Sequence, residues 1–308
     1  MRVAVTGATG LIGSALVREL GARGDEVRAL TRSPRAAAAV LGAGVQLHRW
    51  SDPVTEPPPP GALEGADAVV HLLGEPVAQR WSTAAKRAIR DSRVQSTAML
   101  VRALAELGAE SRPATLVSQS ATGYYGPHGD EELDESAPPG EDFLAVLTRE
   151  WEEAAHGAAR IGTVRLAIAR TGVVLAAEGG ALTRMLTPFR LGLGGPVAGG
   201  GQYVPWVHLA DVTGALLRLI DEPDAHGPFN VTAPNPASNA ELSHALGRVL
   251  GRPAVLPVPA AALRLLYGEM ASIVIDGARV VPAKLLDLGF GFAFPQLEPA
   301  LREVLGRT

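Results

Sequence analysis

The chain has 308 residues, 47% of them hydrophobic, and its 28 Lys and Arg against 32 Asp and Glu give a formal net charge of -4. This length predicts one large or two smaller domains, and the charge balance excludes the basic surface typical of proteins that bind nucleic acid or anionic membranes. Because the chain has no cysteine, disulfides, thiolate catalysis and sulfur-ligated zinc are excluded as well.

The first apolar run, Met1 to Thr6, ends at a glycine and lacks the charged start and cleavage pattern of a signal peptide. We interpret it as a strand. Nowhere do about 18 apolar residues follow one another, as a membrane-spanning helix requires. We therefore expect a cytoplasmic protein that binds neither membranes nor nucleic acid.

Short apolar runs alternate with longer helical patterns up to about Thr171. The expected strands are Arg2–Thr6, Glu26–Thr31, Val45–Arg49, Ala68–Leu73, Thr115–Ser118 and Thr163–Ala169, and the main expected helices are Leu11–Arg23, Ala84–Leu107 and Leu144–Ala159. Near-continuous apolar strands separated by helices predict an α/β fold with a Rossmann-type, doubly wound parallel sheet. Four consecutive prolines in Glu56–Gly61 predict a surface loop that joins neither a helix nor an interior strand.

After Thr171 the pattern becomes irregular, and glycine clusters interrupt it at Gly192–Gly195 and Gly199–Gly201. The elements expected here are strands at Tyr203–Val207 and Phe229–Val231 and helices at Val212–Ile220, Asn239–Leu250, Ala260–Gly268 and Leu297–Leu305. We expect residues 1–175 to form the Rossmann domain, joined by about 205–232. Residues 176–204 and 233–308 would form a smaller, mostly helical C-terminal substrate lobe over the carboxyl edge of the sheet.

The strongest local motif, Gly7-Ala8-Thr9-Gly10-Leu11-Ile12-Gly13, joins the first expected strand to the first expected helix. Gly7 permits a tight turn, Gly10 lets the backbone approach a phosphate, and Gly13 lets the helix pack close to the strand. The N–H groups and the positive end of the helix then favour a pyrophosphate. The motif predicts a dinucleotide site whose contacts include Thr6, Gly7, Gly10 and Gly13.

The end of the second expected strand predicts which nicotinamide dinucleotide binds. Sites for NAD place a carboxylate there to accept hydrogen bonds from the ribose, but this strand ends in Thr31-Arg32-Ser33. Arg32 can pair with a 2′-phosphate through its planar guanidinium, and Ser33 can add a hydroxyl donor. We therefore predict NADP(H), with Thr31, Arg32 and Ser33 as contacts. The alternative is that Arg32 is a solvated surface arginine.

Further motifs are spread along the whole chain. They are Thr6–Gly13, Val70–Pro76, Arg80-Trp81, Asp91-Ser92-Arg93, Ser118–Gly126, Pro139–Phe143, Arg170–Leu175, Trp206-Val207-His208 with Asp211, and Asn230–Pro236. Together they resemble the atypical extended short-chain dehydrogenases/reductases, in the branch named epimerase family protein and also labelled nucleoside-diphosphate-sugar epimerase. The tail from Gly268-Glu269-Met270 to Phe294-Pro295 resembles that branch's short C-terminal domain of unknown function. The resemblance implies a Rossmann fold and NADP(H), with no settled substrate.

The resemblance also implies roles for residues at the strand ends. Leu72, Leu73 and Gly74 would lie beside the cofactor, and Ser118 would also contact it. At the start of the first expected helix, Leu11 and Ile12 would contact the cofactor as well. Ser120 stands where extended short-chain enzymes keep a catalytic serine or threonine near the reacting oxygen of the substrate.

The sequence departs from this family at its usual catalytic pair. Extended short-chain enzymes activate a tyrosine with a lysine four positions later, and the lysine makes the phenol a usable acid or base. In this chain Leu144 and Thr148 stand at the two positions. Tyr124 or Tyr125, from the preceding loop, would then donate the proton with the help of Ser120. The other interpretation is that these tyrosines pack over the cofactor or shape the cleft.

Charged residues near the expected cleft have two interpretations as well. We expect Glu75, Arg184 and Arg190 to contact the substrate, although the helical spacing of Arg184, Met185, Phe189 and Arg190 is equally consistent with packing of the lobe. A buried structural role is favoured for His71 over that of a base.

His208 and Asp211 are a possible acid–base pair, but their spacing favours the start of a helix with Asp211 as its cap. The scattered histidines predict no metal site.

Two classes of function remain open at this point. The first is an NADP(H)-dependent oxidoreductase or epimerase acting on a small hydroxyl or carbonyl compound, which could resemble a sugar nucleotide. The second is a non-catalytic NADP(H)-binding protein with a regulatory or interaction role. Labels within the resembling family also suggest a division-related interaction protein. In either class we expect a monomer or a homodimer.

Overall fold

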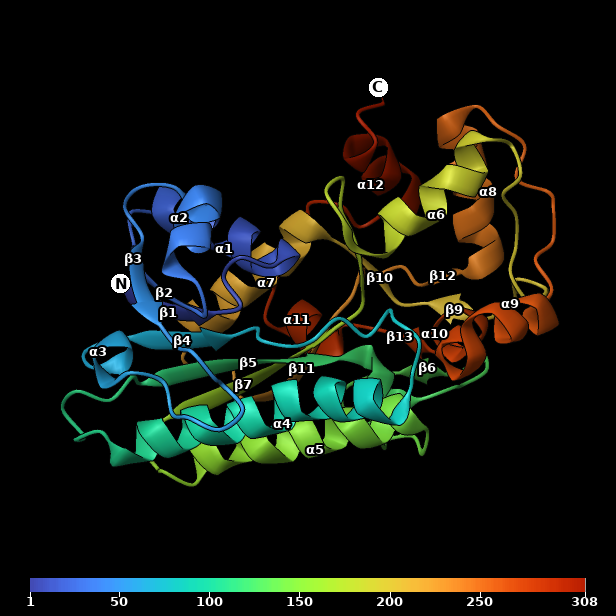
Figure 1. The fold of residues 1–308 in the computed structure, drawn as a ribbon. Helices are drawn as coiled ribbons and strands as arrows, with labels where there is room; N and C mark the ends of the chain where they lie inside the picture. The colour runs from blue at the N-terminus through green and yellow to red at the C-terminus, as the bar shows by residue number, and fades with distance from the viewer. Residues whose placement is uncertain (308) are drawn as a thin grey trace.

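The computed structural model describes residues 1–307 and contains a seven-stranded parallel sheet in the order β11-β7-β5-β4-β1-β2-β3 (Figure 1). The strands are β1 (Arg2–Thr6), β2 (Glu26–Thr31), β3 (Gln46–Arg49), β4 (Ala68–His71), β5 (Thr115–Ala121), β7 (Arg165–Thr171) and β11 (Gly227–Val231). Helices cover both faces, so the predicted Rossmann-type α/β fold is confirmed.

Alternation along β1 shows how the two faces are filled. Val3 and Val5 point into a core with α1 and α7, whereas Ala4 lies in the core on the opposite face with α4 and α5. Figure 1 shows α1, α2 and α7 on one side of the sheet and α4 and α5 on the other. Their bounds are α1 (Leu11–Ala22), α2 (Pro34–Leu41), α3 (Pro60–Leu63), α4 (Thr83–Glu106), α5 (Phe143–Ala159) and α7 (Leu209–Asp221).

A second hydrophobic core lies outside the sheet, where α6 (Gly180–Arg190), α8 (Asn239–Leu250) and α12 (Leu297–Val304) surround Trp206. The short strands β8 (Val173–Leu175), β9 (Tyr203–Val204), β10 (Trp206–His208) and β12 (Ala237–Ser238) contribute to the same core. The strands β6 (Glu132–Leu133) and β13 (Arg279–Val280) pair with each other in a separate small core with Tyr125. The remaining helices are η1 (Thr122–Tyr125), α9 (Ala260–Tyr267), η2 (Gly268–Ala271), α10 (Ser272–Ile275) and α11 (Ala283–Asp287). Leu285 of α11 packs back into the core of the sheet.

Some local predictions need correction. Pro60 and Gly61 open α3, so the proline-rich segment is not entirely a loop. Proline is favoured in the first turn of a helix because its missing N–H would have no partner there. Helix α2 was not predicted, and α7 begins at Leu209, three residues before the expected start. Within residues 1–307, none of the helices combines the length and apolar character that a bilayer span requires.

Candidate functional site

The glycine turn between β1 and α1 is packed against the end of β4. Gly7 has a φ of +64°, and a side chain there would place its Cβ 2.8 Å from the backbone carbon and oxygen of Leu72. A Cβ on Gly13 would lie 2.2 Å from the carbonyl oxygen of Gly7. Gly10 caps α1 without a side-chain hydrogen bond, and the first turn carries no acidic residue. The first N–H groups of α1 are therefore left for an external anion.

A cleft of about 660 Å³ opens beside this turn. Of the predicted contacts, it is lined by Gly7, Gly10, Thr31, Arg32, Ser33, Leu72, Leu73, Gly74 and Glu75. The other predicted contacts, Thr6, Leu11, Ile12, Gly13 and Ser118, do not line it. Thr6 is buried and lies behind the turn, where its hydroxyl accepts from the N–H of Leu72 at 3.1 Å.

The loop after β3 also lines the cleft and was missed from the sequence. Trp50, Asp52 and Val54 lie there. The Asp52 carboxylate accepts from the Thr55 hydroxyl at 2.7 Å and from the Val54 N–H at 3.1 Å, and these bonds lower the pKa of Asp52. The position of this loop could have been predicted from the sequence, because the carboxyl ends of neighbouring parallel strands meet at one edge of the sheet.

The predicted phosphate-recognition residues lie at the end of β2. Arg32 is exposed, and Ser33 caps α2 without using its hydroxyl. The backbone N–H of Ser33 donates to the Thr31 hydroxyl at 3.1 Å, which fixes the turn. Neither the Arg32 guanidinium nor the Ser33 hydroxyl has a hydrogen-bond partner within residues 1–307, so both can bind a ligand.

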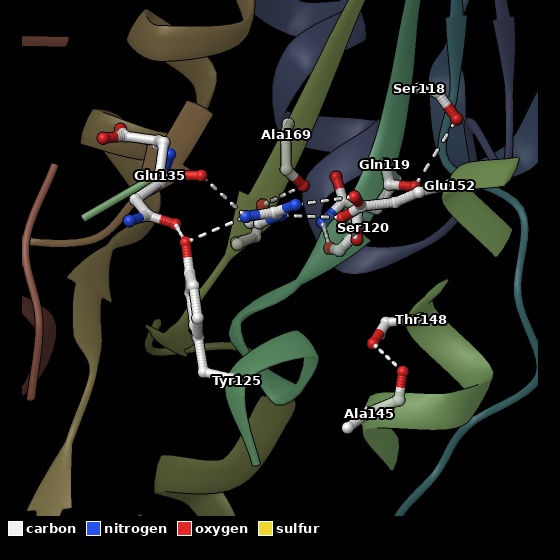
Figure 2. Close-up of polar contacts among 12 residues, drawn as sticks. Ser118, Gln119, Ser120, Tyr125, Glu135, Ala145, Thr148, Glu152 and Ala169 are labelled. Carbon is white, nitrogen blue, oxygen red and sulfur yellow. Dashed lines mark hydrogen bonds and ion pairs between the residues drawn. The ribbon is translucent and has the colours of Figure 1, made fainter. Parts of the chain in front are cut away.

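A buried polar network lies at the carboxyl ends of β5 and β7, where Ser120 and Arg170 are paired. The Ser120 hydroxyl donates to Glu152 of α5 at 2.6 Å, and Glu152 forms a two-pronged ion pair with Arg170, with both N···O distances at 2.8 Å. Figure 2 shows Ser120 and Glu152 pointing toward one another, with Tyr125 reaching the same network from the other side. Burial disfavours the charged arginine, but the bonds and charge of Glu152 outweigh it and raise the pKa of Arg170 above its usual value.

The two candidate tyrosines have different surroundings. Tyr125 is fully buried, and its hydroxyl donates to Asn230 at 2.6 Å and accepts from Arg170 at 3.1 Å. Burial raises the pKa of Tyr125 to about 12, although Arg170 acts in the opposite direction. Tyr124 is half-buried, and the Arg170 guanidinium carbon lies 3.5 Å from the centroid of its ring. The Tyr124 hydroxyl has no partner in the described part of the chain.

The positions of the family's usual tyrosine and lysine carry no acid, base or cation. Leu144 packs beside Gly123, and the buried Thr148 donates its hydroxyl to the backbone oxygen of Leu144 at 2.8 Å. Glu152 lies one further turn along the same face of α5 and was missed. An arginine within the apolar β7 was the signal, since a buried guanidinium needs an acidic partner.

His71 has the structural role that we favoured. It is fully buried, its Nδ1 lies 2.8 Å from the Thr6 hydroxyl and its Nε2 lies 3.3 Å from the Ser96 hydroxyl. Burial lowers the pKa of His71 to about 3. A neutral histidine held between two hydroxyls joins β1, β4 and α4.

The predicted cap of α7 was wrong. His208 caps the helix through Nδ1, which accepts from the N–H of Ala210 at 3.1 Å, and its Nε2 pairs with Glu303 at 2.8 Å. Asp211 instead accepts from the N–H groups of Ala293 and Phe294, at 2.7 and 3.1 Å. His208 and Asp211 therefore each bind the C-terminal segment and do not form an acid–base pair.

The three predicted substrate contacts lie on the loop after β4 and on α6. The exposed Glu75 follows β4, and its backbone oxygen accepts from Arg93 at 2.8 Å. Arg184 of α6 donates to the backbone oxygen of Ala78 at 2.6 Å, and Arg190 is exposed at the other end of α6. Phe189 is buried in the second core, which is lobe packing rather than cleft lining. The part of the chain that the structure describes holds no group of three or more His, Asp or Glu that could bind a metal.

Two known families match most of the chain. Residues 3–232 match the NAD dependent epimerase/dehydratase family, and residues 258–304 match a domain of unknown function, DUF1731. The second match falls on the tail from α9 to α12.

Known relatives and a solved structure match over nearly the full length. The chloroplastic homolog of epimerase family protein SDR39U1 from Arabidopsis thaliana is 40% identical and covers 99% of this chain and 87% of its own. Epimerase family protein MT2273 from Mycobacterium tuberculosis is 41% identical, with 97% and 96% covered. The crystal structure of human epimerase family protein SDR39U1 with NADPH is 35% identical, covers both chains fully and superposes with a TM-score of 0.87.

Proposed function

Because the chain belongs to the NAD-dependent epimerase/dehydratase family, we propose that it binds NADP(H) and acts as an oxidoreductase or epimerase on a small hydroxyl or carbonyl compound. One observation supports the cofactor: the glycine turn that leaves the first N–H groups of α1 for an anion lines the same cleft as the Arg32 guanidinium and the Ser33 hydroxyl, which have no hydrogen-bond partner within residues 1–307. Pyrophosphate and 2′-phosphate would bind at these two points. The NADPH in the human relative supports this assignment.

Replacing Arg32 with alanine is expected to weaken NADPH binding about 10- to 100-fold and to leave NADH binding nearly unchanged, because only NADPH carries the 2′-phosphate. Fluorescence titration with each dinucleotide measures both affinities. Arg35→Ala is the matched control, since Arg35 is also exposed but does not line the cleft. Equal losses for NADPH and NADH in Arg32→Ala would contradict the assignment.

The reaction needs a proton donor or acceptor from the chain, while the bound cofactor supplies or takes the hydride. We assign this role to Tyr124, whose hydroxyl is free and whose ring lies against Arg170. A cation on the ring face fixes the phenol in one orientation. Tyr125 and Glu152 then act as positioning residues, because they hold Arg170 from its other sides.

The Ser120 hydroxyl is oriented by the hydrogen bond that it donates to Glu152, which leaves its oxygen lone pairs for a ligand. A substrate hydroxyl could donate to Ser120 while Tyr124 exchanges a proton with the reacting oxygen. In reduction Tyr124 would give its phenol proton to the carbonyl oxygen, and in oxidation its phenolate would take the proton of the substrate hydroxyl.

The absence of a tyrosine–lysine pair at Leu144 and Thr148 favours the second candidate function, a protein that binds NADP(H) without turnover. The two functions are distinguished by mixing the protein and NADPH with a panel of aldehydes, ketones and sugar nucleotides and following the absorbance of NADPH. Tight NADPH binding with no turnover of any compound would support the binding protein and overturn the enzyme.

For a compound that turns over, Tyr124→Phe is expected to lower kcat about 100-fold with little change in KM, because general acid–base catalysis contributes about 10²–10⁴. Tyr125→Phe is the matched variant and should lower kcat less, since it removes only a support of Arg170. Steady-state kinetics on both proteins measures the difference. An unchanged kcat in Tyr124→Phe would remove this residue from the mechanism.

A further inference from the structure

Helix α6 of the second lobe touches the Rossmann domain on both sides of the glycine turn. At its first residue, a Cβ built on Gly180 would lie 3.3 Å from Cδ2 of Leu11, the residue that begins α1. One turn later, Arg184 donates to the backbone oxygen of Ala78, 106 residues away, at 2.6 Å. Ala78 belongs to the loop whose first part, Leu72 to Glu75, lines the cleft. Helix α6 therefore lies across the ends of β1 and β4.

The sequence explains where α6 begins and which face of the helix is buried. Gly179 and Gly180 have φ values of +101° and +72°, which other residues rarely adopt, so the chain can turn sharply into the helix here. The Thr183 hydroxyl then closes the first turn by accepting from the N–H of Gly179 at 3.1 Å. Leu182, Leu186 and Phe189 anchor the helix in the second core. On its outer side, the exposed Arg184 reaches across to the loop after β4.

No residue of α6 lines the cleft itself within residues 1–307. We infer that α6 covers the adjoining end of the dinucleotide site, beside Leu11 and the loop after β4, and that the Arg184–Ala78 hydrogen bond holds it over the bound cofactor. The inference rests on the proposed binding of NADP(H). It gives Arg184 a role in retaining the cofactor, in place of the substrate contact that the sequence suggested. Because this is a single, exposed hydrogen bond, breaking it to admit or release the cofactor would cost little.

The test is the rate at which NADPH leaves the full-length protein, measured by stopped-flow fluorescence after mixing with excess NADP⁺. Arg184→Met keeps the length of the side chain and removes the donor, and it should speed dissociation about five-fold, the effect of one exposed hydrogen bond from a cation. Arg190→Met is the matched control on the same helix and should leave the rate unchanged.

The possible outcomes distinguish an error in the role of Arg184 from an error in the proposed binding of NADPH. Tight NADPH binding with equal dissociation rates in the native protein and Arg184→Met would overturn the role of Arg184 alone. A rise of the same size in Arg190→Met would also overturn it, because a general loss of helix charge would then explain the effect. A native protein that does not bind NADPH would overturn the proposed function itself.

Discussion

Replacement of Arg170 by methionine is expected to lower the free energy of unfolding by about 3–5 kcal/mol. The side chains of Arg170 and Glu152 are only 4% and 6% exposed, so removing the guanidinium leaves a buried carboxylate without its cation. Four N–H groups of Arg170 are used, two by Glu152, one by Tyr125 and one by the backbone oxygen of Glu135. Methionine fills part of the space but satisfies none of these acceptors.

Urea denaturation followed by circular dichroism measures the loss. Arg160→Met is the matched control, because Arg160 pairs with Glu153 on the same helix while both side chains are about two-thirds exposed. That variant should lose less than about 1 kcal/mol.

The double variant Arg170→Met/Glu152→Gln should recover part of the loss, since neither buried charge remains. Equal losses in Arg170→Met and Arg160→Met would mean that the buried pair contributes no more than a surface pair.

Sequence patterns predict the sheet well because they record a physical constraint on each strand. Val3, Ala4 and Val5 are all apolar, and only a strand covered on both faces buries all three. The glycine turn can be predicted in part for the same reason. The contact of Gly7 with Leu72 depends on the packing of β4, but a Cβ on Gly10 or Gly13 would lie 3.3 or 2.2 Å from the carbonyl oxygen of Gly7, within the turn itself. Local constraints of this kind need no knowledge of the rest of the fold.

The buried network of Ser120, Glu152 and Arg170 could not be predicted from the sequence in the same way. Ser120 and Arg170 are 50 residues apart and become neighbours because β5 pairs with β7, which places them opposite one another. Glu152 joins them from a helix that packs over both strands. The arginine in an apolar strand predicts that an acidic partner exists, but the identity of that partner depends on strand order and helix packing. The same dependence on packing explains why the sequence could not separate Tyr124 from Tyr125.

The largest effect on ligand binding is expected for Gly13→Ala. The added Cβ would lie 2.2 Å from the carbonyl oxygen of Gly7 and 2.8 Å from Cα of Ala8, and both neighbours are backbone atoms that cannot rotate away. The start of α1 must therefore move away from the turn, which withdraws the N–H groups that the pyrophosphate needs. We expect NADPH affinity to fall by more than about 100-fold, equivalent to the loss of two charge-assisted hydrogen bonds.

Gly21→Ala, eight residues later in the same helix, separates this effect from general damage to α1. Nothing lies within 4 Å of a Cβ built on Gly21, so alanine should raise stability by about 0.5–1 kcal/mol through its higher helix propensity. Its NADPH affinity should equal that of the native protein in the same fluorescence titration. If Gly13→Ala bound NADPH as tightly as Gly21→Ala, the pyrophosphate could not lie on this turn, because no arrangement of the backbone accommodates both the methyl group and the present approach of α1 to Gly7.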